Sequence, residues 1–289
     1  MRVVAKLLAG ILGLLVIAGL ILHERVLDLY EQATPMEYQL SDSSVPLPSS
    51  QLPENTVWQP LFNGDKLDGW VPKFAGLPAG ENYRNTFRAE DGLLSVDYSE
   101  WPDFDGEFGH LVTSASFSRY ILRFEYRFIG KQVTDDSSMA WAQRNNGVML
   151  HSQSAESMAL GQKFPVSIEA QLLGGLDDGA RPTANLCTPA TNVVLADKVY
   201  RAHCTESVSD TFHGDQWVKA EFEVLGSDRI RHFINGKLVF EYEQPQYDPF
   251  SGDSEYLGLT SGLIANGHIA FQAESHPTQF RNIELMVLD

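Results

Sequence analysis

Residues 61–70 read LFNGDKLDGW, a stretch with two turn signals in quick succession. The apolar pair Leu61-Phe62 leads into Asn63-Gly64, and Asp68-Gly69 then precedes Trp70. Asn-Gly and Asp-Gly favour tight turns because these residues tolerate a positive φ. The stretch is therefore typical of the opening of a β-rich domain.

The sequence that follows alternates between apolar and polar residues. Residues 119–129 and 217–225 place apolar side chains at every second position, with Arg, Lys or Glu between them. Asn235-Gly236 separates RIRHFI from KLVFEY, which is a strong signal for a two-residue hairpin. Many short strands joined by regular turns indicate an all-β antiparallel sandwich. We expect residues 57–289 to form this one domain.

Three motifs, in this order, resemble those of one known family. Residues 61–70 are similar to the opening motif of the 3-keto-disaccharide hydrolase domain family, long catalogued as a domain of unknown function. Trp217 with residues 231–236 resembles its penultimate hairpin, and residues 262–288 resemble its closing motif. The resemblance implies a concanavalin A-like, laminarinase-like jelly roll of two antiparallel sheets, with one concave face usable as a groove. It also implies cleavage of 3-keto-disaccharides or 3-keto-glycosides.

The N-terminal residues 1–33 have a different composition from the rest of the chain. Arg2 and Lys6 precede an apolar run from Leu7 to Leu22, and no small-x-small cleavage site follows the run. Positive charges before such a run favour a cytoplasmic N-terminus. We predict an uncleaved signal anchor with a short helical extension, which holds the domain in the periplasm at the inner membrane. A cleaved signal peptide, with secretion, is the alternative.

A spacer is predicted over residues 34–56. It contains several serines and little apolar sequence, together with Pro35, Pro46, Pro48 and Pro53. Prolines at this density block helices and sheet ladders, so we expect a semi-extended, solvated segment.

The overall charge restricts the partners. The chain has 38 acidic and 21 basic residues and a net charge of -17. Nucleic-acid binding needs a basic surface, so nucleic acid is not an expected partner.

The two cysteines, Cys187 and Cys204, fit an exported protein. They lie seventeen positions apart in a loop-like stretch. In an oxidising compartment such a pair most simply forms one disulfide. A metal site here would need more ligands, and only His203 is adjacent.

Three predicted strands, residues 147–153, 166–173 and 268–274, carry polar side chains on one face. If they share a sheet, its concave face gathers His151, Gln153, Glu169, Gln171, Gln272 and Glu274. Amides and carboxylates at strand spacing suit the hydroxyl groups of a sugar. His110, on a neighbouring strand, could line the same groove. The alternative is an ordinary solvated sheet face.

A comparison with laminarinase-like glycosidases excludes one reaction mechanism for the strand at residues 169–174. Those enzymes carry an E-x-D-x-x-E strand, and the nearest stretch here is EAQLLG at residues 169–174. The second and third acids are replaced by Gln171 and Gly174, so a two-carboxylate displacement with this spacing is not available.

The 3-keto reaction implied by the resemblance needs different groups. A ketone at C3 acidifies the proton on C2, so a base can remove it and the enolate can expel the C1 substituent. We predict His151 or Glu169 as the base, and Arg281 or a divalent cation as the stabiliser of the oxyanion. A metal site built from His151, Glu169 and Glu274 is conceivable, although their spacing is not a recognised ligand pattern.

A second function class stays open. A non-catalytic, lectin-like module at the cell envelope would use the same amides to hold a glycan. The two classes differ in that a catalyst needs an ionisable base.

Overall fold

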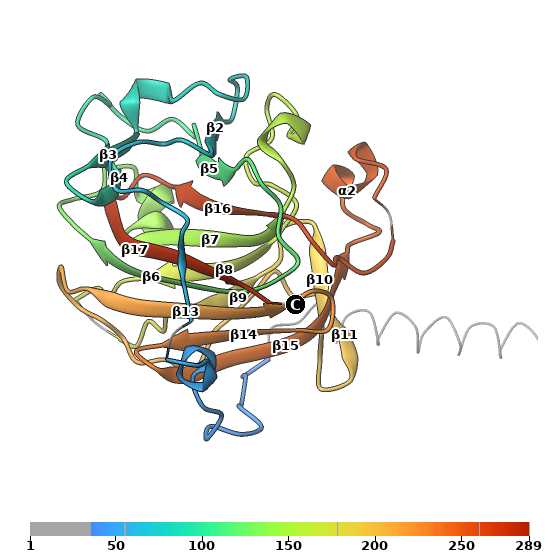
Figure 1. Cartoon of the computed structure of the whole chain (residues 1–289). Helices are drawn as coiled ribbons and strands as arrows, with labels where there is room; N and C mark the ends of the chain where they lie inside the picture. Colours follow the sequence, from blue (N-terminus) through green and yellow to red (C-terminus); the bar gives the residue numbers. More distant parts are fainter. Residues whose placement is uncertain (1–35, 55, 178, 260, 289) are drawn as a thin grey trace, which may run out of the picture.

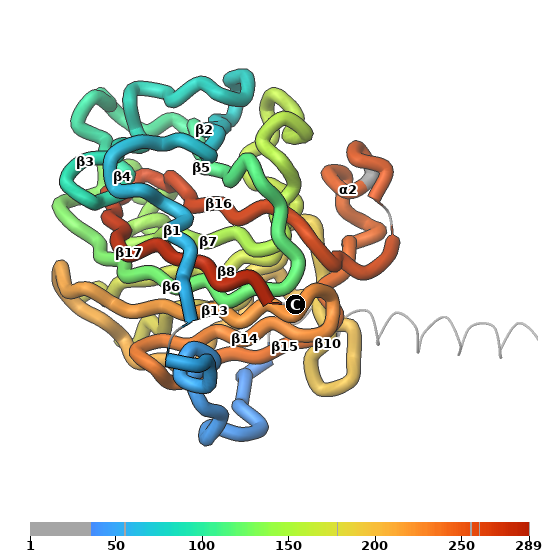
Figure 2. Tube along the Cα trace, in the orientation of Figure 1, coloured from blue at the N-terminus to red at the C-terminus, as the bar shows by residue number. Residues whose placement is uncertain are grey.

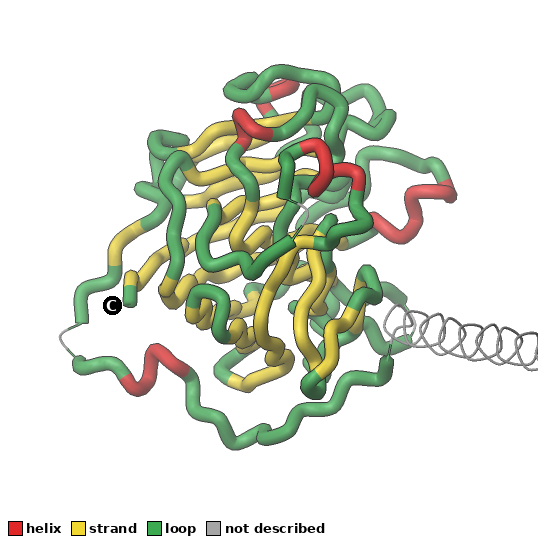
Figure 3. The backbone as a smooth tube through the Cα atoms, turned by 90° about the vertical axis from the view of Figure 1, so that its right-hand side faces the viewer, coloured by secondary structure: helices red, strands yellow, loops and turns green. Residues whose placement is uncertain are grey.

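The computed structural model describes residues 36–54, 56–177, 179–259 and 261–288. Within them the chain forms two antiparallel sheets packed face to face (Figure 1). A view from the side shows that strands and loops dominate and that helical segments are short (Figure 3). The predicted all-β antiparallel sandwich is confirmed.

Sheet A is the larger layer, with strand order β11-β10-β15-β14-β13-β6-β17-β4-β3 and with β1 paired to β17. Its strands are β1 (Gln59–Pro60), β3 (Phe87–Glu90), β4 (Leu93–Val96), β6 (Arg119–Phe128), β10 (Thr191–Leu195), β11 (Lys198–Tyr200), β13 (Val218–Leu225), β14 (Arg229–Ile234), β15 (Lys237–Tyr247) and β17 (Thr278–Val287).

Sheet B has the order β12-β9-β8-β7-β16-β5-β2. Its strands are β2 (Trp70–Phe74), β5 (Gly109–Thr113), β7 (Asn145–Ser152), β8 (Ile168–Leu173), β9 (Asn185–Cys187), β12 (Cys204–Thr205) and β16 (His268–Ala273). The helical segments are η1 (Pro48–Gln51), η2 (Tyr83–Asn85), η3 (Ser137–Ala142), η4 (Ala155–Ser157) and α2 (Gly252–Tyr256).

The core lies between the sheets and is rich in aromatic rings. In β6 the alternate residues from Tyr120 to Phe128 are buried, whereas Arg123 and Glu125 between them are partly exposed. Phe271 of sheet B contacts Phe124 and Phe280 of sheet A, with ring centroids 5.2 and 4.5 Å apart. The alternation in the sequence therefore predicted correctly which side chains of β6 are buried, because alternate positions of a strand point to opposite faces.

The opening motif folds as two turns that fix the start of β2. The Asn63 side chain accepts hydrogen bonds from the backbone N–H groups of Asp65 and Lys66, and Gly64 and Gly69 have φ of 85° and 84°. Trp70 is buried and its Nε1 donates to the Leu61 carbonyl at 3.1 Å. The hairpin at Asn235-Gly236 joins β14 to β15, as expected.

The segment that precedes the domain docks on sheet A. Tyr38 stacks on Phe240 with ring centroids 3.9 Å apart, and its hydroxyl accepts from the Glu241 backbone N–H at 2.8 Å. Ser49 N–H donates to the Glu221 carboxylate at 2.9 Å. Most of residues 36–54 are exposed, but at Tyr38 and Ser49 the segment is held against sheet A. Figure 2 shows its blue tube beside β14 and β15.

The predicted signal anchor, residues 1–33, lies outside the described residues. In the part of the chain that the structure describes, no helix has the length and apolar character needed to cross a membrane.

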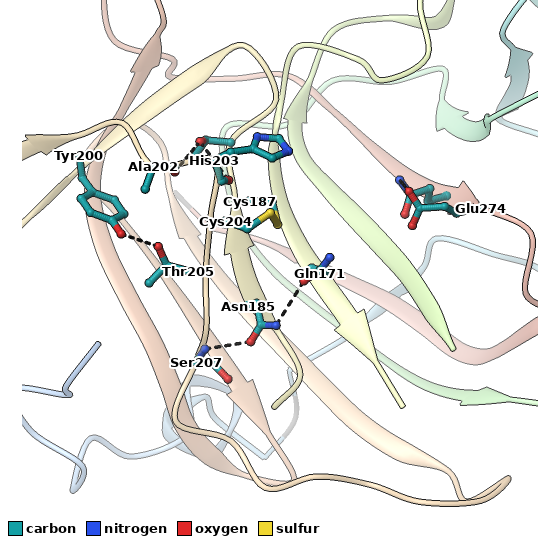
Figure 4. The surroundings of a disulfide bond; sticks show 12 residues. Gln171, Asn185, Cys187, Tyr200, Ala202, His203, Cys204, Thr205, Ser207 and Glu274 are labelled. Carbon is teal, nitrogen blue, oxygen red and sulfur yellow. Dashed lines mark hydrogen bonds between the residues drawn. A yellow bond between two sulfur atoms is a disulfide. The ribbon is translucent and has the colours of Figure 1, made fainter. Parts of the chain in front are cut away.

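Cys187 and Cys204 form a disulfide, which confirms the predicted pairing. They are cross-strand partners in β9 and β12, and Figure 4 shows the bond tying these two strands together. Cys187 is also the register partner of Glu169 on β8. The covalent link therefore fixes the sheet edge next to one of the predicted catalytic residues.

Candidate functional site

One row of side chains runs across sheet B on the face turned away from the core. The register places Lys73 beside His110, His110 beside Gln272, and Gly147 beside Gln171, which in turn lies beside Asn185. The neighbouring positions on the same strands, Leu111, Val148, Ala170, Leu186 and Phe271, belong to the core. This outer face therefore gathers polar side chains from five strands, with Gly147 of β7 in the middle of the row.

Two carboxylates lie beside this row. Glu169 is two positions before Gln171 on β8, and Glu274 directly follows β16; their side chains are only 6% and 3% exposed. A Cβ added at Gly147 would overlap Glu169 Oε1, so the glutamate side chain lies directly across this glycine. Gln272 Nε2 donates to Glu274 Oε1 at 3.4 Å.

The two carboxylates are close enough to affect each other. Burial raises the pKa of Glu169 to about 8. Burial also raises the pKa of Glu274 well above its usual range, and the charge of Glu169 raises it further. Two buried acids that cannot both ionise take different roles, so the pair can act as one base and one proton donor.

Glu169 should make stability depend on pH. Its pKa rises from an ordinary 4.5 to about 8 on folding. The folded state therefore holds this proton more tightly, and the stability it contributes is full below pH 4.5 and lost as pH rises through about 8. Glu169→Gln cannot ionise, so between these limits its unfolding free energy should fall less than that of the wild type, by on the order of a few kcal/mol.

Urea denaturation of both proteins at about pH 5 and about pH 8.5 measures this difference. Glu243→Gln, at an exposed position of β15, is the matched control and should follow the wild type. Parallel behaviour of Glu169→Gln and the wild type would show that Glu169 is not a buried, protonated acid.

His110 lies at the far end of the polar row and is covered. Its ring is completely buried, and neither nitrogen has a hydrogen-bond partner among the described residues. Burial, and then the charge of Lys73, lower its pKa to about 3, so the imidazole is neutral. Lys73 Nζ donates to the carbonyls of Phe74 and Leu160 at 2.7 and 3.1 Å, and Phe164 packs edge-on against the His110 ring.

The other end of the row opens into a groove. Gln171 Oε1 accepts from Asn185 Nδ2 at 3.2 Å (Figure 4). Both side chains line a cavity of about 700 Å³. Residues 204–208 and 36–38 form its other walls. Gln171, which is predicted to bind a sugar, thus lines a cavity together with its amide partner Asn185.

His151 does not join the carboxylates, so the prediction that it shares their face is wrong. Its Nε2 lies 3.0 Å from the Gly226 carbonyl of sheet A, and its ring faces the core residue Tyr120. The cause is local: His151 has φ of 50°, and the register between β7 and β16 shifts beside it. This irregularity breaks the alternation on which the prediction depended.

Two further predicted residues lie elsewhere. Arg281 is on β17 of sheet A, where it is bonded to Glu125 at 2.7 Å and covers the Trp217 ring. It cannot stabilise an oxyanion beside Glu169, and that prediction is wrong. Gln153 uses its amide to hold the loop after β7: its Oε1 accepts from the Val166 N–H at 2.7 Å and from Gln162.

His151, Glu169 and Glu274 do not form the metal site that was suggested for them, because the His151 side chain points away from the two carboxylates. Across residues 36–54, 56–177, 179–259 and 261–288, no group of three or more His, Cys, Asp or Glu side chains has an arrangement suited to a metal ion.

Sequence reasoning missed three members of the site: Lys73, Asn185 and Gly147. Lys73 and Asn185 could be placed only once the register of their strands was known. Gly147 did carry a signal, since a glycine inside a strand often marks a close approach of another group.

Comparisons with known proteins identify the family of the domain. The profile of the 3-keto-alpha-glucoside-1,2-lyase-like domain matches residues 57–286, which is most of the chain. No curated protein matches it in sequence.

Solved structures with a similar shape include two candidate glycosyl hydrolases from Parabacteroides distasonis. One is 19% identical, with a TM-score of 0.47, and the match covers 80% of this chain and 94% of that one. The other is 16% identical, with a TM-score of 0.48 and coverage of 81% and 100%. The carbohydrate-binding module CBM66 of Bacillus subtilis is 12% identical, with a TM-score of 0.36 and coverage of 66% and 93%.

Proposed function

Because the chain belongs to the 3-keto-alpha-glucoside-1,2-lyase-like domain family, we propose that it cleaves the glycosidic bond of 3-keto-glycosides on the outer face of sheet B. The observation that carries the proposal is the buried pair Glu169 and Glu274 beside Gln272. Paired acids with raised pKa values in a polar setting are typical of acid–base catalysis.

The proposed reaction begins with Glu169. Its carboxylate takes the proton from C2 of the keto-sugar, and the electron pair forms an enolate with its charge on the C3 oxygen. The C1–O bond then breaks, and Glu274 gives its proton to the departing oxygen. Water adds across the new double bond, with hydroxyl to C1 and a proton to C2, so that the net change is hydrolysis.

The enolate oxygen needs a donor that does not compete as a base. His110 is neutral and lies next to Gln272 in the row, and the charge of Lys73 acts on it. His110 and Lys73 are too deeply buried to touch the sugar, so we assign to this end of the row a long-range role: the charge of Lys73, acting across His110 and Gln272, stabilises the enolate oxygen, since preorganised charges lower the cost of charge development. The groove over Gln171 and Asn185 would take the departing group.

The proposed location is the cell envelope, with residues 1–33 as a membrane tether. The disulfide between Cys187 and Cys204 supports export, because such bonds persist in oxidising compartments.

A non-catalytic carbohydrate-binding module is the second candidate. The amide-lined groove beside Gln171 and Asn185 supports it, because a lectin needs the same hydrogen-bonding groups.

The purified protein should be tested against 3-keto-trehalose and 3-keto-glucosides. We expect glucosidic cleavage with incorporation of solvent deuterium at C2 when the reaction is run in D₂O, since proton removal there is part of the mechanism. Binding of the same sugars is measured by calorimetry. Tight binding without cleavage or exchange would exclude the hydrolase and favour the module.

A further inference from the structure

A separate cavity of about 380 Å³ lies beside the turn that follows β16. Residues 130–144 form most of its wall, and His276 forms the rest. The cavity is linked to the carboxylate face through Ser275, which follows Glu274 and accepts a hydrogen bond from Gln132 at 2.9 Å. Its lining includes Lys131, Asp135, Asp136 and Arg144.

His276 is a buried histidine whose two ring nitrogens are not satisfied. It is 2% exposed, and within the described part of the chain neither ring nitrogen makes a hydrogen bond of ordinary geometry, although the Ile129 carbonyl lies close enough to act on the ring. Its ring packs edge-on against Phe128, with centroids 5.7 Å apart. A buried polar side chain without partners is costly, and in a native structure it indicates a missing partner.

Arg144 presents a second unmatched group at the same cavity. Its Nε is buried and has no partner in the described residues, while its Nη2 donates to the Gly214 carbonyl and lies 3.5 Å from Asp215. The guanidinium contacts the same Phe128 ring at 5.9 Å. His276 and Arg144 therefore flank one aromatic ring.

The charges around His276 are positive. Burial, and then Arg144 and Arg181, lower its pKa to about 4, with the Ile129 carbonyl acting in the opposite direction. Within the described residues, Arg181 donates to the carbonyls of Arg144, Gly174 and Trp141, so no carboxylate neutralises it.

Two acids, Asp135 and Asp136, also line the cavity, and their charges balance those of Lys131 and Arg144. Both oxygens of Asp136 are used by Ser138, as acceptors from its backbone N–H at 2.9 Å and from its hydroxyl at 2.7 Å. Asp135 is exposed at the mouth. Lys131, also exposed, adds a further positive charge there.

We propose that this cavity binds a compact oxyanion, a carboxylate or a phosphate, between His276 and Arg144. An anion would accept from the unmatched Arg144 Nε–H and would favour protonation of His276, which then donates as well. Because Gln132, which lines the cavity, is bonded to Ser275, the residue after Glu274, the proposal rests on the proposed function and extends it: the anion is a charged group carried by the sugar. The lining pairs two cationic side chains with two acids, and the proposed anion contacts only the two unmatched groups, His276 and Arg144 Nε.

Calorimetry with inorganic phosphate and with glucuronate tests the site, together with NMR of the histidine ring protons. We expect both ligands to bind and to shift one imidazole signal that is absent in His276→Gln. His276→Gln and Arg144→Gln should each weaken binding about tenfold or more, as expected when a charge-assisted hydrogen bond is lost. Arg119→Gln, on sheet A, is the control and should bind as the wild type does.

His276→Gln alone decides the outcome if Arg144→Gln fails to fold. Equal binding by His276→Gln and the wild type, or no binding of either anion, would overturn the proposal. Glucuronate that binds no more tightly than phosphate would remove the link to the sugar. Glu169→Gln should keep phosphate binding while turnover is lost, so failure of the proposed function is distinguishable from failure of this site.

Discussion

Replacing Glu169 by Gln should lower kcat for 3-keto-glucosides by about 10²- to 10⁴-fold, the usual contribution of a general base. The amide fits the space over Gly147 but cannot take the C2 proton. Deuterium exchange at C2 should fall by the same factor. Glu243→Gln, at an exposed site on β15, should keep wild-type activity.

Glu274→Gln distinguishes the proposed role of Glu274 as proton donor from that of Glu169 as base. A proton donor matters most for a poor leaving group, so this variant should be strongly impaired on 3-keto-trehalose and much less on a 3-keto nitrophenyl glucoside, whose leaving oxygen needs no proton. The Glu169→Gln defect should be the same for both substrates. If both defects depend on the leaving group in the same way, the assignment of base and donor is wrong.

Replacing Gly147 by Ala should reduce kcat by about 10²-fold and destabilise the fold by about 1–3 kcal/mol. The added methyl group would overlap Glu169 Oε1 and would come within 2.9 Å of its Cδ. The carboxylate must then move away from the substrate position. Steady-state kinetics and urea denaturation measure the two effects.

Gly252→Ala is the matched control, because a Cβ there meets no atom within 4 Å. It should leave activity and stability unchanged. Wild-type activity in Gly147→Ala would show that the present position of Glu169 is not the one that catalysis uses.

The alternating strands and the turns between them could be predicted from the sequence. Period two in residues 119–129 correctly identified the buried face of β6, and Asn235-Gly236 correctly located the hairpin between β14 and β15. The pairing of Cys187 with Cys204 was also predicted. These features depend on the local backbone, or on having only two cysteines, so sequence contains the information needed.

The candidate site was predicted only in part. Glu169, Gln171, Gln272 and Glu274 share the predicted face, because the first three lie on regular parts of their strands and Glu274 directly follows β16. His151 was misplaced because a positive φ next to a register shift turned it toward sheet A. Arg281 was misplaced because nothing in its own strand says which of two sheets that strand joins.

By itself, the sequence determined the strands, the turns between them and the sides on which polar groups fall, since these follow from local φ preferences and the two-residue repeat of a strand. Only the tertiary structure decided which strands are neighbours. That choice brought Gly147 under Glu169, set Glu274 beside it and buried both acids, and burial is the reason that their pKa values differ from those of ordinary glutamates.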